Sequence, residues 1–280
     1  MLGQDVVALL REQGQDVEVS ARRDLDVTDA AACMTAVLGF DVVVNCAAWT
    51  AVDDAEAQEG EAFGANALGP ANLARAASAA GARLVHVSTD YVFDGEASAP
   101  YAADAPVAPR SAYSRTKAAG EWAVRSYDVH GRHLVVRTAW LYGAGGPSFP
   151  RTIVRLARER GAVAVVTDQV GQPTWTRDVA DLVWRAVAAD VPGGTFHATS
   201  GGVASWFDFA QEAVAAAGLA RSVVETTTSD AFVRPAPRPS YSVLGHDELV
   251  TAGIAPIDDW RDRWAAACAS DGFAAAVLGA

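Results

Sequence analysis

The stretch Leu84-Val-His-Val-Ser88, followed directly by Thr89-Asp-Tyr-Val-Phe-Asp94, sets the fold class of this chain. A short apolar run rich in β-branched residues that ends in a polar turn is typical of a strand buried in a parallel sheet. The same pattern occurs in Asp41–Asn45 and in His133–Thr138. A long helix is predicted at about 60–80, between the strand at Asp41–Asn45 and the strand at Leu84–Ser88. Repeated strand–helix units predict an α/β fold, a doubly wound parallel sheet with helices on both faces.

The rest of the chain continues this alternation. We expect helices near residues 1–14, 30–38, 178–189, 206–217 and 258–268, and strands near 16–21, 163–167 and 195–199. The pattern favours a dinucleotide-binding domain over residues 1–143, to which segments near 163–199 return. A smaller, mainly substrate-binding lobe is predicted for residues 144–280.

Composition excludes several classes of function. The 280 residues carry a net charge of −12, so nucleic acid is not an expected partner. The three cysteines are widely spaced and form no metal-binding pattern with histidine, so we predict no metal site and reduced thiols in a cytoplasmic protein. The N-terminus lacks a basic region followed by an apolar run, so we expect no signal peptide, and no apolar run approaches the ~20 residues of a membrane span.

The stretch Ser111-Ala-Tyr-Ser-Arg-Thr-Lys117 carries the strongest chemical signal. Tyr113 and Lys117 are four residues apart at the start of a predicted helix, which places them on one face. A lysine ammonium beside a tyrosine is expected to lower the pKa of the phenol from about 10 and so help it to donate a proton. Lys117 is the only lysine in the chain, although a solvated helix lysine is the alternative interpretation.

Ligands of such sheets bind at the carboxyl ends of the strands, where the strand order reverses. Residues 47–50, 88–91 and 138–142 follow three of the predicted strands. We therefore expect these three turns to meet at one edge of the sheet and to form the ligand site together with the helix that carries Tyr113.

The chain resembles the extended short-chain dehydrogenases/reductases, and within them it is similar to the dTDP-4-dehydrorhamnose reductase family. The resemblance covers nearly the whole chain in order. It is carried by six segments: Asn45–Glu56, Val87–Gly95, Tyr113–Glu121, Arg137–Gly143, Asp168–Thr174 and Arg234–Ser240. It implies a Rossmann-like fold and the transfer of a hydride from a nicotinamide to the C4 ketone of a dTDP-linked 4-keto-6-deoxyhexose.

The resemblance also implies catalytic roles. Tyr113 would give a proton to the ketone oxygen, and Thr89 would donate a hydrogen bond to the same oxygen. Lys117 would keep the phenol acidic and bind the nicotinamide ribose. The alternative role for Thr89 is to cap the Ser-Thr-Asp turn. Asp90 is assigned to the substrate region, where it is expected to orient the backbone.

Cofactor positions of the family fall on Gly3, Asp26, Val27, Ala48, Trp49 and Thr50, in addition to Tyr113 and Lys117. Arg22 and Arg23 follow the second predicted strand, where an acidic residue would select a free ribose 2′-hydroxyl. Arginines there suit a 2′-phosphate, so we favour NADPH over NADH. Ordinary solvated arginines are the alternative.

Three further positions resemble substrate contacts of the family. Trp140 is expected to stack on the sugar, unless it is a core or interface aromatic. Arg234 and Arg238 lie in a Pro-rich segment, and two planar cations on a stiff backbone suit a diphosphate. Surface arginines are the alternative. A homodimer is possible for this family.

The chain departs from the family at its start. Leu2-Gly3 matches the end of a Gly-x-x-Gly-x-x-Gly loop, so the first strand of the family fold and two glycines of the loop are missing. We expect a coding start that was assigned too late, with a native protein longer by roughly a dozen residues. The alternatives are a non-catalytic nucleotide-binding regulatory subunit, like that of methionine adenosyltransferase, and a 4-ketoreductase of another dTDP-deoxysugar.

Overall fold

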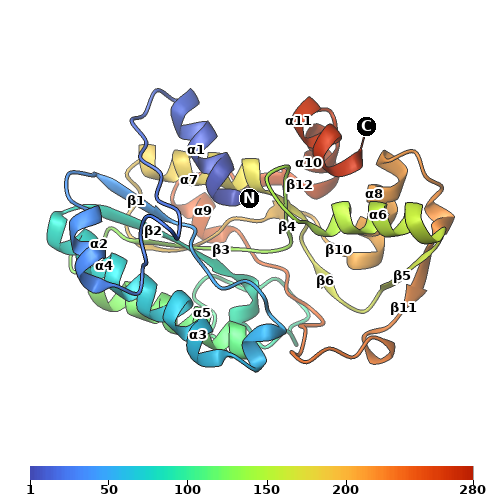
Figure 1. Cartoon of the computed structure of the whole chain (residues 1–280), viewed down its shortest axis with the longest axis horizontal. Coiled ribbons are helices and arrows are strands. Elements are labelled where there is room, and N and C mark those ends of the chain that lie inside the picture. Colours follow the sequence, from blue (N-terminus) through green and yellow to red (C-terminus); the bar gives the residue numbers. More distant parts are fainter. Residues whose placement is uncertain (280) are drawn as a thin grey trace.

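The computed structural model describes residues 1–279 and is built around a four-stranded parallel sheet with the order β1–β2–β3–β8 (Figure 1). These strands are β1 (Val42–Asn45), β2 (Arg83–Thr89), β3 (Leu134–Thr138) and β8 (Gly194–His197). All three pairings are parallel, with Val85 opposite Leu134 at the centre. The three strands predicted from the apolar runs are confirmed.

Successive side chains of the central strands enter two different cores. Val85, Leu134 and Val136 pack with α1 (Leu2–Glu12), α7 (Thr176–Ala188) and Leu249 of α9 (Asp247–Thr251). Leu84 and Val135 pack on the other face with residues of α2 (Ala30–Ala36), α4 (Gly69–Ala80) and α5 (Ala112–Tyr127). Figure 1 shows these two helical layers above and below the sheet. This is the doubly wound α/β arrangement that the sequence predicts.

The helix predicted for about 60–80 is present but not uniform. It consists of α3 (Glu59–Phe63), a π-helical turn η2 (Gly64–Leu68) and α4, which follow one another without a break. A π-turn inserts one residue into the helical repeat, and such turns are frequent at functional sites. Here the turn carries Asn66, whose role is described below.

The predicted strand at 16–21 is wrong. Residues 15–21 have no regular structure, and Val19 is 53% exposed. A strand needs a neighbour for its backbone N–H and C=O groups, and among residues 1–279 no strand pairs with the outer edge of β1. The valines of β1 are accordingly only half-buried, whereas β2 and β3 are almost completely buried.

A second group of elements lies beside the sheet, at the right of Figure 1. Its helices α6 (Phe149–Arg160) and α8 (Trp206–Ala216) pack on a parallel pair, β5 (Val163–Val166) with β11 (Val224–Thr227). Thus β5 lies outside the central sheet, whereas α7 and β8 return to it. The helix α6 was not predicted. The division of the chain near residue 143 stays a prediction.

Short elements connect these parts. Three two-residue or three-residue strand pairs occur: β4 (Leu141–Tyr142) with β7 (Thr174–Trp175), β6 (Val170–Gly171) with β10 (Ala204–Ser205), and β9 (Ser200–Gly201) with β12 (Ile257–Asp259). The chain ends with α10 (Trp260–Cys268), α11 (Asp271–Phe273) and η6 (Ala274–Leu278). Four 3-10 turns complete the list: η1 (Asp54–Glu56), η3 (Asp90–Val92), η4 (Arg221–Val223) and η5 (Ser229–Ala231). Within residues 1–279, none of the helices has the length and apolar character to cross a membrane.

Candidate active site

The N-terminus of α5 is fixed by two side chains. Ser111 caps the helix by accepting a hydrogen bond from Ser114 N (3.1 Å), and the Ser114 hydroxyl accepts one from Ser111 N (2.8 Å). The carboxylate of Glu56, from η1, accepts a further bond from Ala112 N (2.8 Å). Side-chain oxygens satisfy main-chain N–H groups that have no partner inside a helix. The first turn of α5, which carries Tyr113, is therefore held in place.

Tyr113 and Lys117 occupy successive turns of α5, as the sequence predicts. Lys117 is 2% exposed, and its Nζ donates a hydrogen bond to Val87 O of β2 (2.6 Å). The half-buried Tyr113 ring packs edge-on against Tyr91, with the ring centroids 6.1 Å apart, and with Trp49 in a small cluster. The phenol and the ammonium thus lie at the carboxyl ends of β1 and β2. Their catalytic roles stay predictions.

The sequence predicts a lowered pKa for the Tyr113 phenol, and this prediction is wrong. Burial raises the pKa of Tyr113 to about 12, and the nearby Thr89 hydroxyl only partly offsets this effect. Burial also lowers the pKa of Lys117 to about 8, against the opposing charge of Glu121. The spacing predicts the shared helix face, but it cannot show how deeply each of the two groups lies in the protein.

Thr89 caps its turn, as one of its two predicted interpretations has it, and its catalytic role stays a prediction. Its hydroxyl oxygen caps η3 by accepting a hydrogen bond from Tyr91 N (3.2 Å), and its O–H donates to Asp90 Oδ1 (2.9 Å). The Thr89 hydroxyl also lies close enough to the Tyr113 phenol to lower the pKa of that phenol. Burial raises the pKa of Asp90 to about 6. Asp90 therefore orients Thr89, and whether it binds substrate stays a prediction.

The loop after β1 is tied to α5 by Asn66 of the π-turn. Asn66 Oδ1 accepts a bond from Trp49 N (2.8 Å), and its Nδ2 donates to Trp49 O (3.1 Å) and to the Thr116 hydroxyl (3.0 Å). Ala48 and Thr50, on either side, are exposed. Asn66 was not predicted; a buried asparagine in an otherwise apolar helix is the only signal of it in the sequence.

Of the other predicted cofactor positions, Gly3 lies at the same strand end, and Asp26 and Val27 lie in the loop before α2. Gly3, in the first turn of α1, faces Cys46 at the end of β1: a Cβ on Gly3 would lie 3.5 Å from Cys46 Cβ. Asp26 Oδ1 accepts bonds from the N–H and the hydroxyl of Thr28 (2.9 and 2.8 Å), and Val27 O accepts one from Asn72 Nδ2 (3.0 Å). These contacts shape the loop before α2, and its predicted binding role stays a prediction.

Trp140 is held in an unusual backbone conformation. Its φ is +45°, a region in which a bulky residue is strained. Its ring stacks on Trp206, with centroids 3.6 Å apart and planes 6° apart. Gly171 lies so close to the indole that a Cβ there would be 2.5 Å from Trp140 Cε2. The ring is half-buried between these neighbours, and its predicted stacking on a sugar stays a prediction.

Arg234 and Arg238 meet at a carboxylate that the sequence did not single out. Arg234 Nη1 lies 3.1 Å from Asp53 Oδ2, and Arg238 Nη2 lies 2.9 Å from Asp53 Oδ1. Ala236 N also donates to Asp53 Oδ1 (3.3 Å). Burial opposes the ionised form of Asp53, but these bonds and charges hold its pKa below the usual range. The two arginines are thus brought together, as their proposed role requires.

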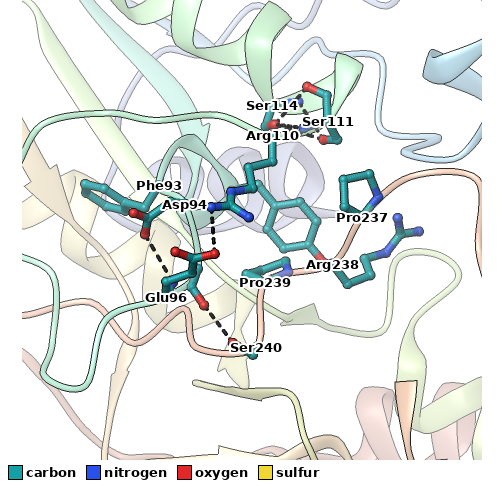
Figure 2. A pocket seen from close by; sticks show the side chains of 12 residues that line it. Phe93, Asp94, Glu96, Arg110, Ser111, Ser114, Pro237, Arg238, Pro239 and Ser240 are labelled. Atoms are coloured by element: carbon teal, nitrogen blue, oxygen red, sulfur yellow. Dashed lines mark hydrogen bonds and ion pairs between the residues drawn. The ribbon is translucent and has the colours of Figure 1, made fainter. Parts of the chain in front are cut away.

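A pocket next to this ion pair is lined by η3, the start of α5 and the Pro-rich segment (Figure 2). Figure 2 shows Ser111 and Ser114 at one side and Pro237, Arg238 and Pro239 at another. Arg110, which borders the pocket, forms an ion pair with Glu96 (2.6 Å).

Behind the site, a buried ion pair joins α5 to the sheet. Glu121 and Arg137 are almost completely buried and form two parallel bonds of 2.8 Å. The Ser88 hydroxyl donates to Glu121 (2.6 Å), and Arg125 adds another bond (2.8 Å). Burial alone would raise the pKa of Glu121, but these bonds hold it below the usual range. The sequence analysis assigned no role to this pair.

Comparisons with known proteins match nearly the whole chain. A family model described as RmlD substrate binding domain matches residues 1–271. A dTDP-4-dehydrorhamnose reductase of Streptomyces griseus is 46% identical, over 93% of this chain and 88% of the relative. A probable dTDP-4,6-dihydroxy-2-methyloxan-3-one 4-ketoreductase of Streptomyces antibioticus is 48% identical, over 93% of this chain and 89% of the relative.

A solved structure extends the likeness to three dimensions. The dTDP-4-dehydrorhamnose reductase of Bacillus anthracis, in complex with NADP, superposes with a TM-score of 0.90 at 32% identity. The match covers 95% of this chain and 94% of that protein.

Proposed function

We propose that this chain, which belongs to the RmlD substrate binding domain family, is a dTDP-4-dehydrorhamnose reductase. It reduces the C4 ketone of dTDP-4-dehydro-β-L-rhamnose to dTDP-L-rhamnose with NADPH. The observation that carries this proposal is the meeting of Thr89, Tyr113 and Lys117 at the carboxyl end of β2. A hydroxyl, a phenol and a buried ammonium are the groups that a carbonyl reduction needs.

NADPH supplies the hydride. Negative charge develops on the ketone oxygen as the hydride is transferred, and Tyr113 gives that oxygen its proton. Thr89, which lies near the Tyr113 phenol, turns its O–H from Asp90 Oδ1 to the same oxygen and stabilises the charge. Lys117 lies one helical turn further on, and its positive charge favours the phenolate that remains after proton transfer.

The residues around the strand ends fit a dinucleotide. The N-terminus of α1, an 11-residue helix, lies beside Cys46 and can receive a phosphate. Ala48 and Thr50 are small and exposed, and Trp49 is fixed through its main chain. Lys117 uses one N–H on Val87 O, which leaves donors for ribose hydroxyls. Arg22 and Arg23 are exposed near Asp26, where they suit the 2′-phosphate of NADPH.

For the substrate, we assign the diphosphate to Arg234 and Arg238 and the deoxysugar to the region of Asp90 and Trp140. The thymidine-linked substrate enters beside the pocket of Figure 2, because Arg238 lines that pocket. We place the reaction in the cytoplasm, where Cys33, Cys46 and Cys268 would stay reduced. A homodimer stays a prediction that sedimentation equilibrium would test.

A second candidate is the reduction of another dTDP-linked 4-ketosugar. It is favoured by the 48% identity with the 4-ketoreductase of Streptomyces antibioticus, which is comparable to the 46% identity with the reductase of Streptomyces griseus. Both candidates use the same residues at the ketone. They differ in the sugar, and therefore in the contacts around Asp90 and Trp140.

A substrate comparison tests the proposal. The chain is supplied with NADPH and with dTDP-4-dehydrorhamnose or another dTDP-4-keto-6-deoxyhexose, and the loss of nicotinamide absorbance is followed. We expect kcat/KM to be highest for dTDP-4-dehydrorhamnose, with dTDP-L-rhamnose as the product. A higher kcat/KM for another ketosugar would favour the second candidate. No turnover with any of them, both by this chain and by a version with the missing first strand and glycines restored, would favour a non-catalytic nucleotide-binding subunit.

A further inference from the structure

The segment from Phe232 to Ser240, here called the strap, has a composition that limits its movement. Pro235, Pro237 and Pro239 alternate with other residues along it. Proline fixes φ and lacks a backbone N–H, so the strap is stiff and has few main-chain donors. Most of the polar groups that the strap presents therefore belong to Arg234 and Arg238.

One end of the strap is anchored on the loop after η3. Gly95 O accepts bonds from the Ser240 hydroxyl (2.8 Å) and from Tyr241 N (3.1 Å). Gly95 has a φ of +80°, and a Cβ there would lie 2.4 Å from Pro239 Cβ. Only glycine permits this approach without a shift of the backbone.

The middle of the strap is held by Asp53 alone among the described acidic residues. Asp53 comes from the loop between β1 and η1, 181 residues before Arg234 in the sequence. It receives both guanidinium groups and the Ala236 N–H at distances of 2.9 to 3.3 Å. Two guanidinium groups and a main-chain N–H around one anion form the donor set that proteins use for phosphate oxygens.

The ion pairs are accessible enough to exchange. The side chains of Arg234, Arg238 and Asp53 are 47%, 17% and 25% exposed. Ion pairs of this kind contribute little free energy, since water solvates the separated charges well. A diphosphate carries more charge and more oxygens than one carboxylate, so it can replace Asp53 on the same donors.

The neighbouring pocket is too small for the whole substrate. Its volume is about 190 Å³. Arg238, labelled in Figure 2, and Tyr91 are among the residues that line it. Pockets that enclose small organic ligands usually measure ~300–1,000 Å³. Tyr91 in turn contacts Tyr113, so the pocket adjoins the proposed catalytic residues. A dTDP-sugar therefore extends beyond this pocket, and Arg238 is one of the lining residues that it would contact.

We propose that Asp53 is an internal substitute for the substrate's diphosphate. It holds Arg234 and Arg238 together until a dTDP-sugar binds, and the diphosphate then takes over both arginines. This inference rests on the proposed function, because it takes the nucleotide sugar as the ligand. It assigns to Asp53 a role that lowers the affinity for nucleotide while keeping the two arginines in position.

Calorimetric titration tests this exchange. dTDP is titrated into the wild-type chain, Asp53→Asn and Asp54→Asn at one salt concentration. Asp54 is the matched control, because it is exposed and its side chain has no hydrogen bond or ion pair among the described residues. We expect Asp53→Asn to bind dTDP about threefold to tenfold more tightly, and Asp54→Asn to bind like the wild type. Inorganic pyrophosphate should give the same ratio as dTDP. Arg238→Gln should bind both more weakly.

Two further variants keep the test decisive. Asp53→Glu retains the negative charge and should bind dTDP with about the wild-type affinity. Asp53→Ser removes the charge in another way and replaces Asp53→Asn if that variant does not fold. Unchanged or weaker binding of dTDP by Asp53→Asn and Asp53→Ser, in a chain that reduces the ketosugar, would overturn the exchange and leave the proposed function intact. A wild-type chain that neither binds dTDP nor reduces the ketosugar would overturn both.

Discussion

Lys117 is an ammonium in a place where water cannot solvate it. Burial disfavours the charged form of Lys117, whereas the Glu121 carboxylate one turn away favours it. Val87 O accepts a hydrogen bond from the ammonium. A charged group withdrawn from water costs free energy unless it is paired. The chain thus bears this cost at its single lysine.

The pH dependence of kcat/KM follows from Lys117. Its folded pKa is about 8, so the ammonium loses its proton above that value, whereas Tyr113, at about 12, stays protonated. We predict that kcat/KM falls as pH rises from about 8 to 10. Measurement of initial rates across this range checks the prediction, since kcat/KM reports groups of the free enzyme. A rate that is constant up to pH 10 would contradict it.

Lys117→Met separates stability from activity. The pKa of Lys117 is lowered on folding from 10.5 to about 8, so the folded state binds fewer protons between these values and stability increases with pH there. Below pH 8 the buried ammonium lowers the free energy of unfolding by its full amount, and methionine removes this effect. We predict a gain of up to about 3 kcal/mol in the free energy of unfolding at pH 7 and a loss of turnover. Urea unfolding measures the gain; a less stable variant would argue against it.

Gly171→Ala tests the support of Trp140. The added Cβ would lie 2.5 Å from Trp140 Cε2 and would push the indole off Trp206. We predict a higher KM for the ketosugar and a loss of about 1–3 kcal/mol in stability. Gly60→Ala is the control, because a Cβ there meets nothing within 4 Å. Equal KM values for Gly171→Ala and the wild type would exclude Trp140 from the substrate site.

At the residue scale, the sequence was informative about the types of the candidate catalytic residues and the spacing between them. It placed Tyr113 and Lys117 on one helix and Thr89 at the end of a strand. The pKa of Tyr113 was predicted in the wrong direction, because the depth of a side chain depends on elements far away in the chain. Asp53 and Asn66 were missed for the same reason: their partners lie 181 and 17 residues away.

At the scale of elements, α5 links the chemistry to the sheet. Its start is capped by Ser111 and Glu56, and its middle is joined to β3 through Glu121 and Arg137. A buried carboxylate with a guanidinium partner is costly to separate, since the remaining charge has no solvent. The position of Tyr113 and Lys117 relative to β2 therefore depends on contacts that do not touch the reacting atoms.

Glu121→Gln measures this link. The amide leaves the Arg137 charge buried without its counter-ion, so we predict a loss of about 3–5 kcal/mol in the free energy of unfolding. Glu159→Gln serves as the control, because its pair with Arg155 joins the same side-chain types four residues apart on an exposed face of α6. Urea unfolding should show almost no change for the control. Similar midpoints for the two variants would show that the buried pair contributes little.

Elements were predicted best where they were long and regular. The apolar runs identified β1, β2 and β3, and helical periodicity identified α5, α7 and α8. The strand at 16–21 was wrong because alternation in the sequence cannot supply a neighbouring strand. The two-residue strands and α6 were missed, since they depend on contacts across the second group of elements.

At the scale of the whole molecule, the layered fold brings distant segments to one edge. The loop after β1, the turn after β2, α5 and the strap approach one another there, although they span residues 46 to 240. Strand–helix alternation predicts the layers and the ligand edge. It does not predict the strap, whose place follows from its contacts with Gly95 and Asp53.

Cofactor choice is a property of the whole site that thermal unfolding can report. A ligand that binds the folded chain alone raises its stability by RT ln(1 + [L]/Kd). We predict a larger rise of the unfolding temperature with NADPH than with NADH at equal concentration. Replacing Arg22 and Arg23 by alanine should remove the difference. Equal shifts in the wild type would mean that these arginines do not read the 2′-phosphate.

The central claim is that Tyr113 gives a proton to the ketone oxygen. The most direct measurement is the single-turnover rate of NADPH oxidation with dTDP-4-dehydrorhamnose, for the wild type and for Tyr113→Phe, with dTDP affinity measured in parallel. The account predicts that the phenylalanine variant binds dTDP normally and reacts at least about 100-fold more slowly. A Tyr113→Phe variant that reduces the ketone at the wild-type rate would contradict it.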